Sequence, residues 1–191
     1  AGMGIDMSQR VAMFEDSLAI MRQLWAGETV SHDRFWHLEN AHIAPLPAQD
    51  IEVWIGATAP AAINRTARLA EGWLGTPSAT PQQAKEQLNQ YRQACAEHQR
   101  TPSAVALRRD IFIAGSANEA EAFRNHAVAR GYRGFPEEAL ICGDVSQVAD
   151  QFAEFSDVGF TDIVVRNMSS DQSQALATIE ALSDVRRQLN L

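Results

Sequence analysis

The residues best suited to chemistry lie in a short turn, Gly56-Ala57-Thr58-Ala59, which follows an apolar run and precedes a helical pattern. Glycine has no Cβ, so an anion can approach its backbone closely. The first amides of the following helix have no partner within that helix, and its dipole places partial positive charge there. Thr58 adds a hydroxyl group. The pattern therefore predicts a site that can hold a phosphate group.

A purely structural role is the alternative for this turn, because most turns between a strand and a helix in α/β proteins bind nothing. The turn lacks the glycine fingerprint of a dinucleotide-binding fold and the Gly-Lys-Ser/Thr of a nucleotide-hydrolysing loop. The residue pattern alone leaves both interpretations open.

Histidine and cysteine give no metal-binding pattern. His32, His37 and His42 are spaced five and five, without a carboxylate at a helical spacing of four, so we predict no metal site. Cys95 and Cys142 lie far apart and form no Cys-x-x-Cys pair. We interpret them as free thiols in a reducing cytoplasm.

Composition narrows the class of protein. The chain has 191 residues, 46% of them hydrophobic, which is enough for one domain with a substantial core. A net charge of −8 argues against a nucleic-acid partner, which would need a basic face. No window approaches the apolar length of a membrane span, and the first residues show no signal-peptide pattern, so we expect a cytoplasmic protein without membrane attachment.

Apolar runs alternating with helical patterns predict a parallel α/β sheet. We expect four buried strands, at Val53–Ile55, Trp73–Leu74, Val105–Ala114 and Ile163–Val165. Four such strands form an open sheet or the second half of an eight-stranded barrel. An amphipathic helix from Val11 to Trp25 has no strand before it, which favours the half-barrel.

The intervening segments complete a single predicted domain over residues 1–191. Residues 29–44 read as a small hairpin or an extended loop, and 140–144 as a short element before a capped helix. The glycine-rich stretch 131–136 is either a mobile lid or an ordered connection. Further helices are expected at about 81–99, 120–129, 145–158 and 171–189.

Motifs along nearly the whole chain occur in a familiar order. Each is weak alone, but their order and spacing resemble the bacterial luciferase-like flavin-dependent monooxygenase family. The motifs are Gly4-Ile5-Asp6-Met7-Ser8-Gln9-Arg10, Phe14-Glu15, Leu24-Trp25-Ala26-Gly27-Glu28, Pro45-Leu46-Pro47, Val53-Trp54-Ile55-Gly56-Ala57, Ala67-Arg68-Leu69-Ala70-Glu71-Gly72-Trp73, Ile141-Cys142-Gly143-Asp144 and Val158-Gly159-Phe160-Thr161-Asp162-Ile163-Val164-Val165-Arg166.

This resemblance implies a (β/α)8 TIM-type barrel of which the chain carries strands five to eight, with the N-terminal half absent. It also implies reduced FMN, or a related deazaflavin, at the carboxyl end of the barrel. The family's phosphate-binding turn maps onto Gly56, Ala57, Thr58 and Ala59. Thr76 and Arg166 follow later strands at the same end, and we predict that they also bind the cofactor. Many relatives have two glycines where this chain has Gly56-Ala57, and Asp where it has Glu71.

The activity implied is that of a flavin-dependent oxidoreductase. Monooxygenase members use reduced FMN and oxygen to oxidise a small organic substrate. Two alternatives remain, a deazaflavin-dependent hydride transfer and a half-barrel without catalysis. No catalytic residue is predicted, because the family's first four strands usually supply the residues nearest the chemistry. The resemblance also implies a homo-oligomer.

Overall fold

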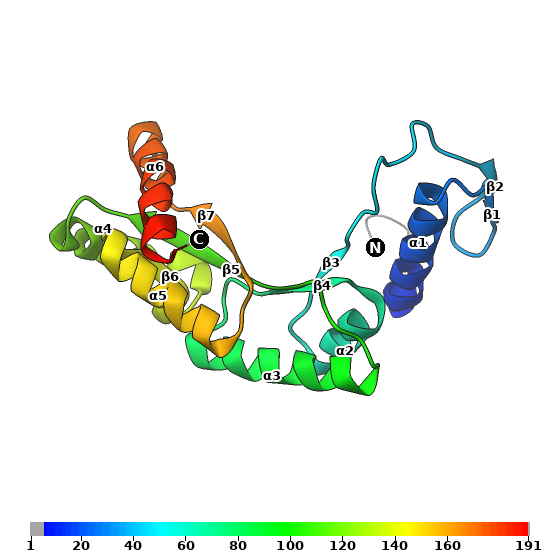
Figure 1. Ribbon diagram of the computed structural model, residues 1–191, viewed down its shortest axis with the longest axis horizontal. Helices are drawn as coiled ribbons and strands as arrows, with labels where there is room; N and C mark the ends of the chain where they lie inside the picture. The colour runs from blue at the N-terminus through cyan, green and yellow to red at the C-terminus, as the bar shows by residue number, and fades with distance from the viewer. Residues whose placement is uncertain (1–5, 191) are drawn as a thin grey trace. The chain divides into compact units, whose positions relative to one another are not determined.

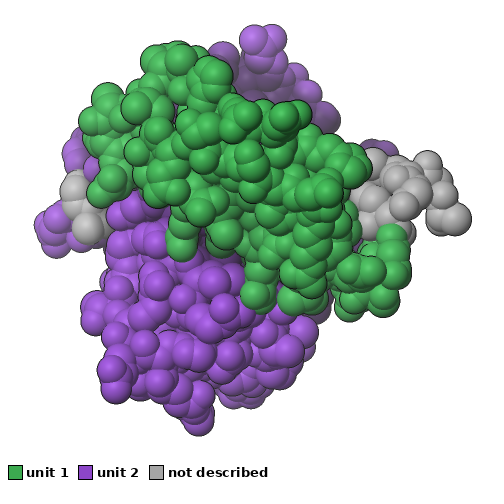
Figure 2. Space-filling model, turned by 90° about the vertical axis from the view of Figure 1, so that its right-hand side faces the viewer, with its two compact units in different colours: residues 1–51 green, residues 52–191 purple. Residues whose placement is uncertain are grey.

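The computed structural model describes residues 6–190, which fall into two compact units with a boundary between Ile51 and Glu52. Figure 1 follows the chain through both units, and Figure 2 colours the units by residue range. Each unit is described by itself. The expectation of one domain over residues 1–191 stays a prediction.

The described residues of unit 1 form a 3-10 turn, an α-helix and a hairpin. The 3-10 turn, η1 (Met7–Gln9), leads into α1 (Arg10–Trp25). Gly27 has φ of +81°, the left-handed conformation that commonly ends a helix. Strands β1 (Val30–His32) and β2 (Leu38–Ala41) then pair antiparallel, so the hairpin interpretation of this region is correct.

Unit 2 is built around a parallel sheet whose strands are connected by helices (Figure 1). The strands are β3 (Trp54–Gly56), β4 (Gly72–Gly75), β5 (Ala104–Ile113), β6 (Leu140–Gly143) and β7 (Asp162–Asn167). The helices are α2 (Pro60–Leu69), α3 (Pro81–Glu97), α4 (Ala117–Ala129), α5 (Val145–Val158) and α6 (Gln172–Gln188), with 3-10 turns η2 (Tyr132–Gly134) and η3 (Glu137–Ala139). The four expected strands are all present and parallel.

The sheet also contains β6, a fifth strand that the sequence suggested only as a short element. Ala106 and Leu107 of β5 pair with both β4 and β7, so these two strands lie on opposite sides of β5. Residues near its end pair with both β6 and β7. Strand β6 therefore continues the edge where β4 stops. The length of β5 makes this possible, because ten residues can serve two short strands in succession.

Alternation along the strands separates two faces of the sheet. Leu107 and Ile111 of β5 and Trp73 of β4 belong to the main core, to which α2, α3, α5 and α6 also contribute. The opposite face has partly open positions at the sheet margins. There Trp54 and Val164 are 39% and 40% exposed. In a closed barrel this second face is the one that lines the interior.

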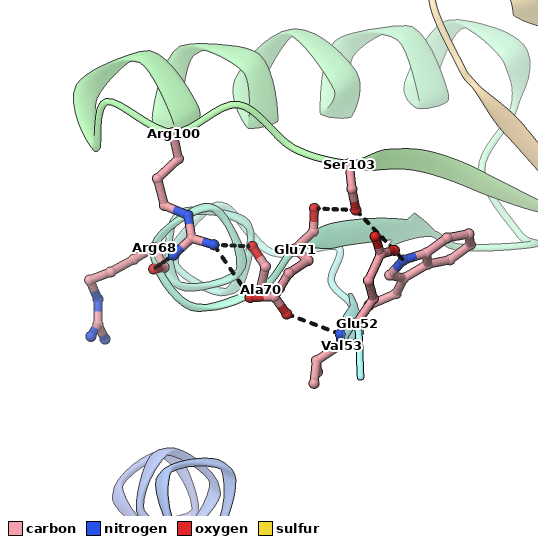
Figure 3. Close-up of polar contacts among 8 residues, drawn as sticks. Glu52, Val53, Arg68, Ala70, Glu71, Arg100 and Ser103 are labelled. Carbon is pink, nitrogen blue, oxygen red and sulfur yellow. Dashed lines mark hydrogen bonds and ion pairs between the residues drawn. The ribbon is translucent and has the colours of Figure 1, made fainter. Parts of the chain in front are cut away.

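The amino ends of the central strands carry a connected polar network (Figure 3). One carboxylate oxygen of Glu71 accepts the Val53 amide at 3.0 Å, and the other lies 3.6 Å from the Arg100 guanidinium. Ser103 donates to the Glu52 carboxylate and is also bonded to the Glu71 carbonyl. Arg100 further donates to the carbonyl groups at the end of α2, those of Arg68 and Ala70. At the amino ends of these strands, side chains of the protein itself form hydrogen bonds with the neighbouring backbone groups.

No helix in the part of the chain that the structure describes is long and apolar enough to cross a membrane.

Candidate functional site

The turn between β3 and α2 is hydrogen-bonded to a buried tryptophan. The indole Nε1 of Trp73, on the neighbouring strand β4, donates to the Ala57 carbonyl at 2.9 Å. Trp73 is fully buried, and Ala57 is 6% exposed. The start of the turn is therefore fixed, and the residues that follow it, Thr58 and Ala59, lead into α2 in a defined direction.

Helix α2 differs from the other helices of unit 2 at its N-terminus. Each of α3, α4, α5 and α6 has an N-cap side chain that accepts a hydrogen bond from a backbone N–H of its own helix. These caps are Thr80, Ser116, Asp144 and Asp171. The N-cap of α2 is Ala59, which has no side-chain acceptor. Within residues 6–190, the N–H groups of Thr58, Ala59 and Ala61 have no protein acceptor assigned. This helix end can receive an anion.

Gly56 leaves space at the same turn. A Cβ built there would meet one protein atom within 4 Å, the Leu74 carbonyl oxygen at 3.9 Å. Its φ is not positive, so neither packing nor backbone conformation of the protein itself requires glycine here. The open space fits the cradle that a phosphate group would need, and a larger side chain would fill it.

A cavity of about 610 Å³ joins this turn to the segment after β4, to helix α3 and to the segment that follows η2. Thr58 and Thr76 line it together, which brings two of the predicted site residues into one place. Ser78 adds a third hydroxyl, 3.0 Å from that of Thr76. Phe135 and Pro136, beyond η2, form another part of the wall. Within the glycine-rich segment, Tyr132 is buried and its ring lies edge-on to Phe135.

Arg166 lies apart from that cavity, within β7, and takes part in a charge cluster. The register places Arg166 opposite Asp110 of β5, and their side chains are 3.7 Å apart. Arg133 of η2 donates to the same Asp110 oxygen at 3.0 Å. Asp110 is fully buried, whereas the side chains of Arg133 and Arg166 are 40% and 46% exposed. One buried carboxylate therefore positions two partly exposed cations.

Several buried polar atoms around this cluster have no hydrogen-bond partner among the described residues: Nε and Nη2 of Arg109, Oδ1 of Asp110 and the hydroxyl of Tyr132. Burial lowers the pKa of Arg109 to about 10 and raises the pKa of Tyr132 to about 12. The Arg109 guanidinium lies over the Phe155 ring at 4.8 Å and donates to the Thr76 carbonyl. Unsatisfied buried groups of this kind concentrate at functional sites.

Sequence reasoning missed Arg109, Asp110 and Arg133 as site candidates. The available signal was a run of three charged residues, Arg108 to Asp110, in the middle of a segment expected to be a buried strand. Charged residues are rarely buried without partners, so such a run indicates either an edge strand or a paired cluster. The partners themselves could not be found this way, because Arg133 lies 23 residues further along the chain.

The three histidines of unit 1 contact different partners. His32 lies 3.4 Å from Asp16, His37 is 2.5 Å from Asp33, and His42 contacts the Asn40 carbonyl. Residues 6–190 contain no group of three or more His, Cys, Asp or Glu side chains that could hold a metal ion.

Both cysteines are free and buried. Burial raises the pKa of both thiols, to about 11 for Cys142. The Cys142 thiol donates to the Ala120 carbonyl at 3.1 Å, so it serves in packing α4 against β6.

A family model described as luciferase-like monooxygenase matches residues 1–140. An F420-dependent glucose-6-phosphate dehydrogenase of Microbacterium testaceum is 32% identical over 81 residues, which is 42% of this chain and 24% of that protein. A phthiodiolone/phenolphthiodiolone dimycocerosates ketoreductase of Mycobacterium bovis is 28% identical over 173 residues, 86% of this chain and 44% of that protein. The chain thus spans less than half the length of these relatives.

Two solved structures share the fold. Monooxygenase RslO1 from Streptomyces bottropensis superposes with a TM-score of 0.81 at 20% identity, over 98% of this chain and 64% of that one. An F420-dependent secondary alcohol dehydrogenase gives 0.73 at 17% identity, over 97% and 65%. The parallel strands and outer helices are therefore part of a luciferase-like barrel, as predicted. Since its family model covers most of the sequence, the chain belongs to the luciferase-like monooxygenase family.

Proposed function

We propose that this chain is the phosphate-binding part of a flavin-dependent oxidoreductase that uses reduced FMN and oxygen on a small organic substrate. The observation that carries the proposal is the N-terminus of α2, the one helix of the described part of unit 2 that lacks a side-chain cap. A phosphate group bound there would accept hydrogen bonds from the free backbone amides and interact favourably with the helix dipole.

Each residue at the turn has a distinct part in this proposal. Gly56 and Ala57 leave room for the phosphate, the amides of Thr58 and Ala59 donate to it, and the Thr58 hydroxyl adds a further donor. Thr76, across the same cavity, is within the region that the rest of the cofactor would occupy. Reduced flavin supplies the electrons for the reaction, and the protein binds it, orients it and excludes water.

A deazaflavin is the second candidate cofactor. It is favoured by the relatives, since the Microbacterium dehydrogenase and the secondary alcohol dehydrogenase are both described as F420-dependent. In that case the reaction would be a hydride transfer without oxygen. The β3–α2 turn would serve equally, because F420 also carries a phosphate group. Arg166 does not line the cavity with Thr58 and Thr76, so we assign it to the substrate side.

The proposal is tested by titrating the protein with FMN and with F420 while cofactor fluorescence is followed. Gly56→Val should lower the affinity at least tenfold, because its side chain fills the phosphate space. The fold should tolerate valine, since its Cβ meets no protein atom closer than 3.9 Å. Thr58→Ala removes one hydroxyl donor and should cost about threefold to tenfold.

Three results would contradict parts of this account. Equal binding of the cofactor by wild type, Gly56→Val and Thr58→Ala would remove the turn from the site. Binding of F420 but not FMN would replace the monooxygenase by the hydride-transfer candidate. Binding of neither would favour the third alternative, a half-barrel without catalysis.

We also propose a cytoplasmic location and a homo-oligomeric assembly. Two buried free thiols are compatible with a reducing compartment. Light scattering during size-exclusion chromatography measures the assembly directly. A mass of one chain, 21.0 kDa, would contradict the proposed oligomer.

A further inference from the structure

A second cavity, of about 480 Å³, lies between α4, η2 and the segment that joins β7 to α6. Three basic side chains line it: His126 and Arg130 from α4, and Arg133 from η2. Ser169 and Ser170 contribute to the opposite wall. The carboxylate in this lining is that of Asp171, and one of its oxygens already accepts the Gln174 amide as the cap of α6. The described lining therefore carries an excess of positive charge.

Arg133 is paired with Asp110, whereas Arg130 has a basic neighbour in place of a carboxylate. Arg130 lies 3.5 Å from the Nε2 atom of His126. Within residues 6–190, no ion pair is assigned to Arg130. A guanidinium only donates, so this contact is a hydrogen bond to the imidazole nitrogen. The remaining N–H groups of Arg130 are available to a bound anion.

Arg133 is oriented before any ligand arrives. One of its Nη atoms donates to the buried Asp110, and its guanidinium lies 4.5 Å over the Phe135 ring. Four consecutive residues, 131–134, have positive φ, and two of them are not glycine: Tyr132 at +29° and Arg133 at +56°. Such conformations are strained for ordinary residues and persist where the surroundings enforce them. The contacts with Asp110 and Phe135 fix the Arg133 side chain at the boundary of the cavity.

We propose that this cavity binds an oxyanion, a phosphate or carboxylate group carried by the substrate. Arg130 and Arg133 would donate charge-assisted hydrogen bonds to it, and the Ser170 hydroxyl would add a further donor. The Ser169 hydroxyl already donates to the Gln174 side-chain oxygen. Asp110 is a positioning residue, because it acts through Arg133. That the anion belongs to a substrate rests on the proposed function. The anion site itself is separate from the cofactor turn, since the two cavities share no lining residue.

The test uses inorganic phosphate and malonate as probes, at constant ionic strength, with the amide signals of the protein followed by two-dimensional NMR. Saturable shifts are expected at residues 130–134 and 168–171, with a dissociation constant in the millimolar range. The stronger of the two probes identifies phosphate or carboxylate as the preferred group. Arg130→Gln should weaken binding at least fivefold, whereas Lys85→Gln, which removes an exposed charge on α3, should leave it unchanged.

The role of Arg133 needs a variant that keeps the fold. Arg133→Gln alone leaves Asp110 buried without its nearer partner, so the double variant Arg133→Gln/Asp110→Asn is the better test. It should fold and bind phosphate at least fivefold more weakly than Asp110→Asn alone.

The inference is overturned if neither probe shifts these signals, or if Arg130→Gln and Lys85→Gln bind equally well. Shifts confined to residues 57–61 would also overturn it, while they would support the cofactor turn. Shifts at 130–134 and 168–171 in a protein that binds neither FMN nor F420 would uphold the anion site and contradict the proposed cofactor.

Discussion

The amino ends and the carboxyl ends of the strands in unit 2, here called the amino edge and the carboxyl edge of the sheet, differ in how completely their polar groups are hydrogen-bonded. At the amino edge, Glu71, Arg100 and Ser103 satisfy backbone groups of neighbouring segments, as Figure 3 shows. Toward the carboxyl edge, α2 begins without a side-chain cap, and buried atoms of Arg109 and Asp110 lack partners. The difference teaches that charged groups are paired at the amino edge, whereas a helix start and a buried charge cluster stay incompletely paired toward the edge that carries function in barrels of this type.

Burial differs between the edges as well. The side chains of Glu71 and Arg100 are 33% and 37% exposed, so water screens their attraction. Asp110 is fully buried beside Arg133 and Arg166, where an unpaired charge is costly. Substitutions at the amino edge should therefore change stability slightly and binding hardly at all. Substitutions at the carboxyl edge should change one or both strongly.

The largest effect on stability is expected for Arg133→Gln. The substitution leaves the buried Asp110 carboxylate with Arg166, 3.7 Å away, as its remaining ion-pair partner. We expect a loss of roughly 2–3 kcal/mol, below the full cost of breaking a buried pair because Arg133 is partly exposed. Urea unfolding measures it. The double variant with Asp110→Asn should recover more than half, and a single-variant loss under about 0.5 kcal/mol would show that the pair is unimportant.

A smaller effect is expected at the amino edge from Glu71→Gln. Glutamine can still accept the Val53 amide, so the change removes mainly the screened attraction to Arg100. Stability should fall by about 0.5–1 kcal/mol, and the affinity for FMN or F420 should stay the same. A tenfold loss of cofactor affinity in this variant would break the distinction between the two edges.

The smallest effect is expected for Tyr132→Phe, which removes a buried hydroxyl without a protein partner. At neutral pH its stability should equal that of the wild type within about 0.5 kcal/mol, or exceed it slightly. Burial raises the pKa of Tyr132 to about 12, so the folded state holds this proton more tightly than the unfolded state. The wild type should then lose stability relative to the variant as the pH rises from about 10 to about 12. A loss above about 1 kcal/mol at pH 7 would reveal a hydrogen bond to the hydroxyl.

Local patterns in the sequence were sufficient for much of the fold. The helix predicted over Val145–Val158 has those bounds in the structure, because a capping residue precedes it and Gly159 follows it with φ of +110°. Buried strands were found from their apolar runs. Strand β6 was harder to identify, since four residues are too few to show a period, and its partner lies on a strand already occupied by β4.

The candidate site was partly predictable for the same reason. Gly56 to Ala59 stand out because strand, turn and helix are contiguous, and Thr76 follows the next strand. The cluster around Asp110 depends on strand register and on η2, which bring residues 23 and 56 positions apart to one carboxylate. No local pattern reports such pairings. Arg166 was singled out from its place at the end of a strand, but its partner was not.

Ala59→Asp tests the uncapped start of α2, the central feature of the proposed cofactor site, most directly. An aspartate at this N-cap would occupy the free amides, raise stability by about 1 kcal/mol and repel a phosphate group. The measurement compares the affinity for FMN and for riboflavin, and for F420 and its phosphate-free riboside, in wild type and variant. We predict at least a tenfold preference for one phosphorylated cofactor in the wild type and its near loss in Ala59→Asp. A preference that survives the substitution, or is missing from the wild type, would contradict the account.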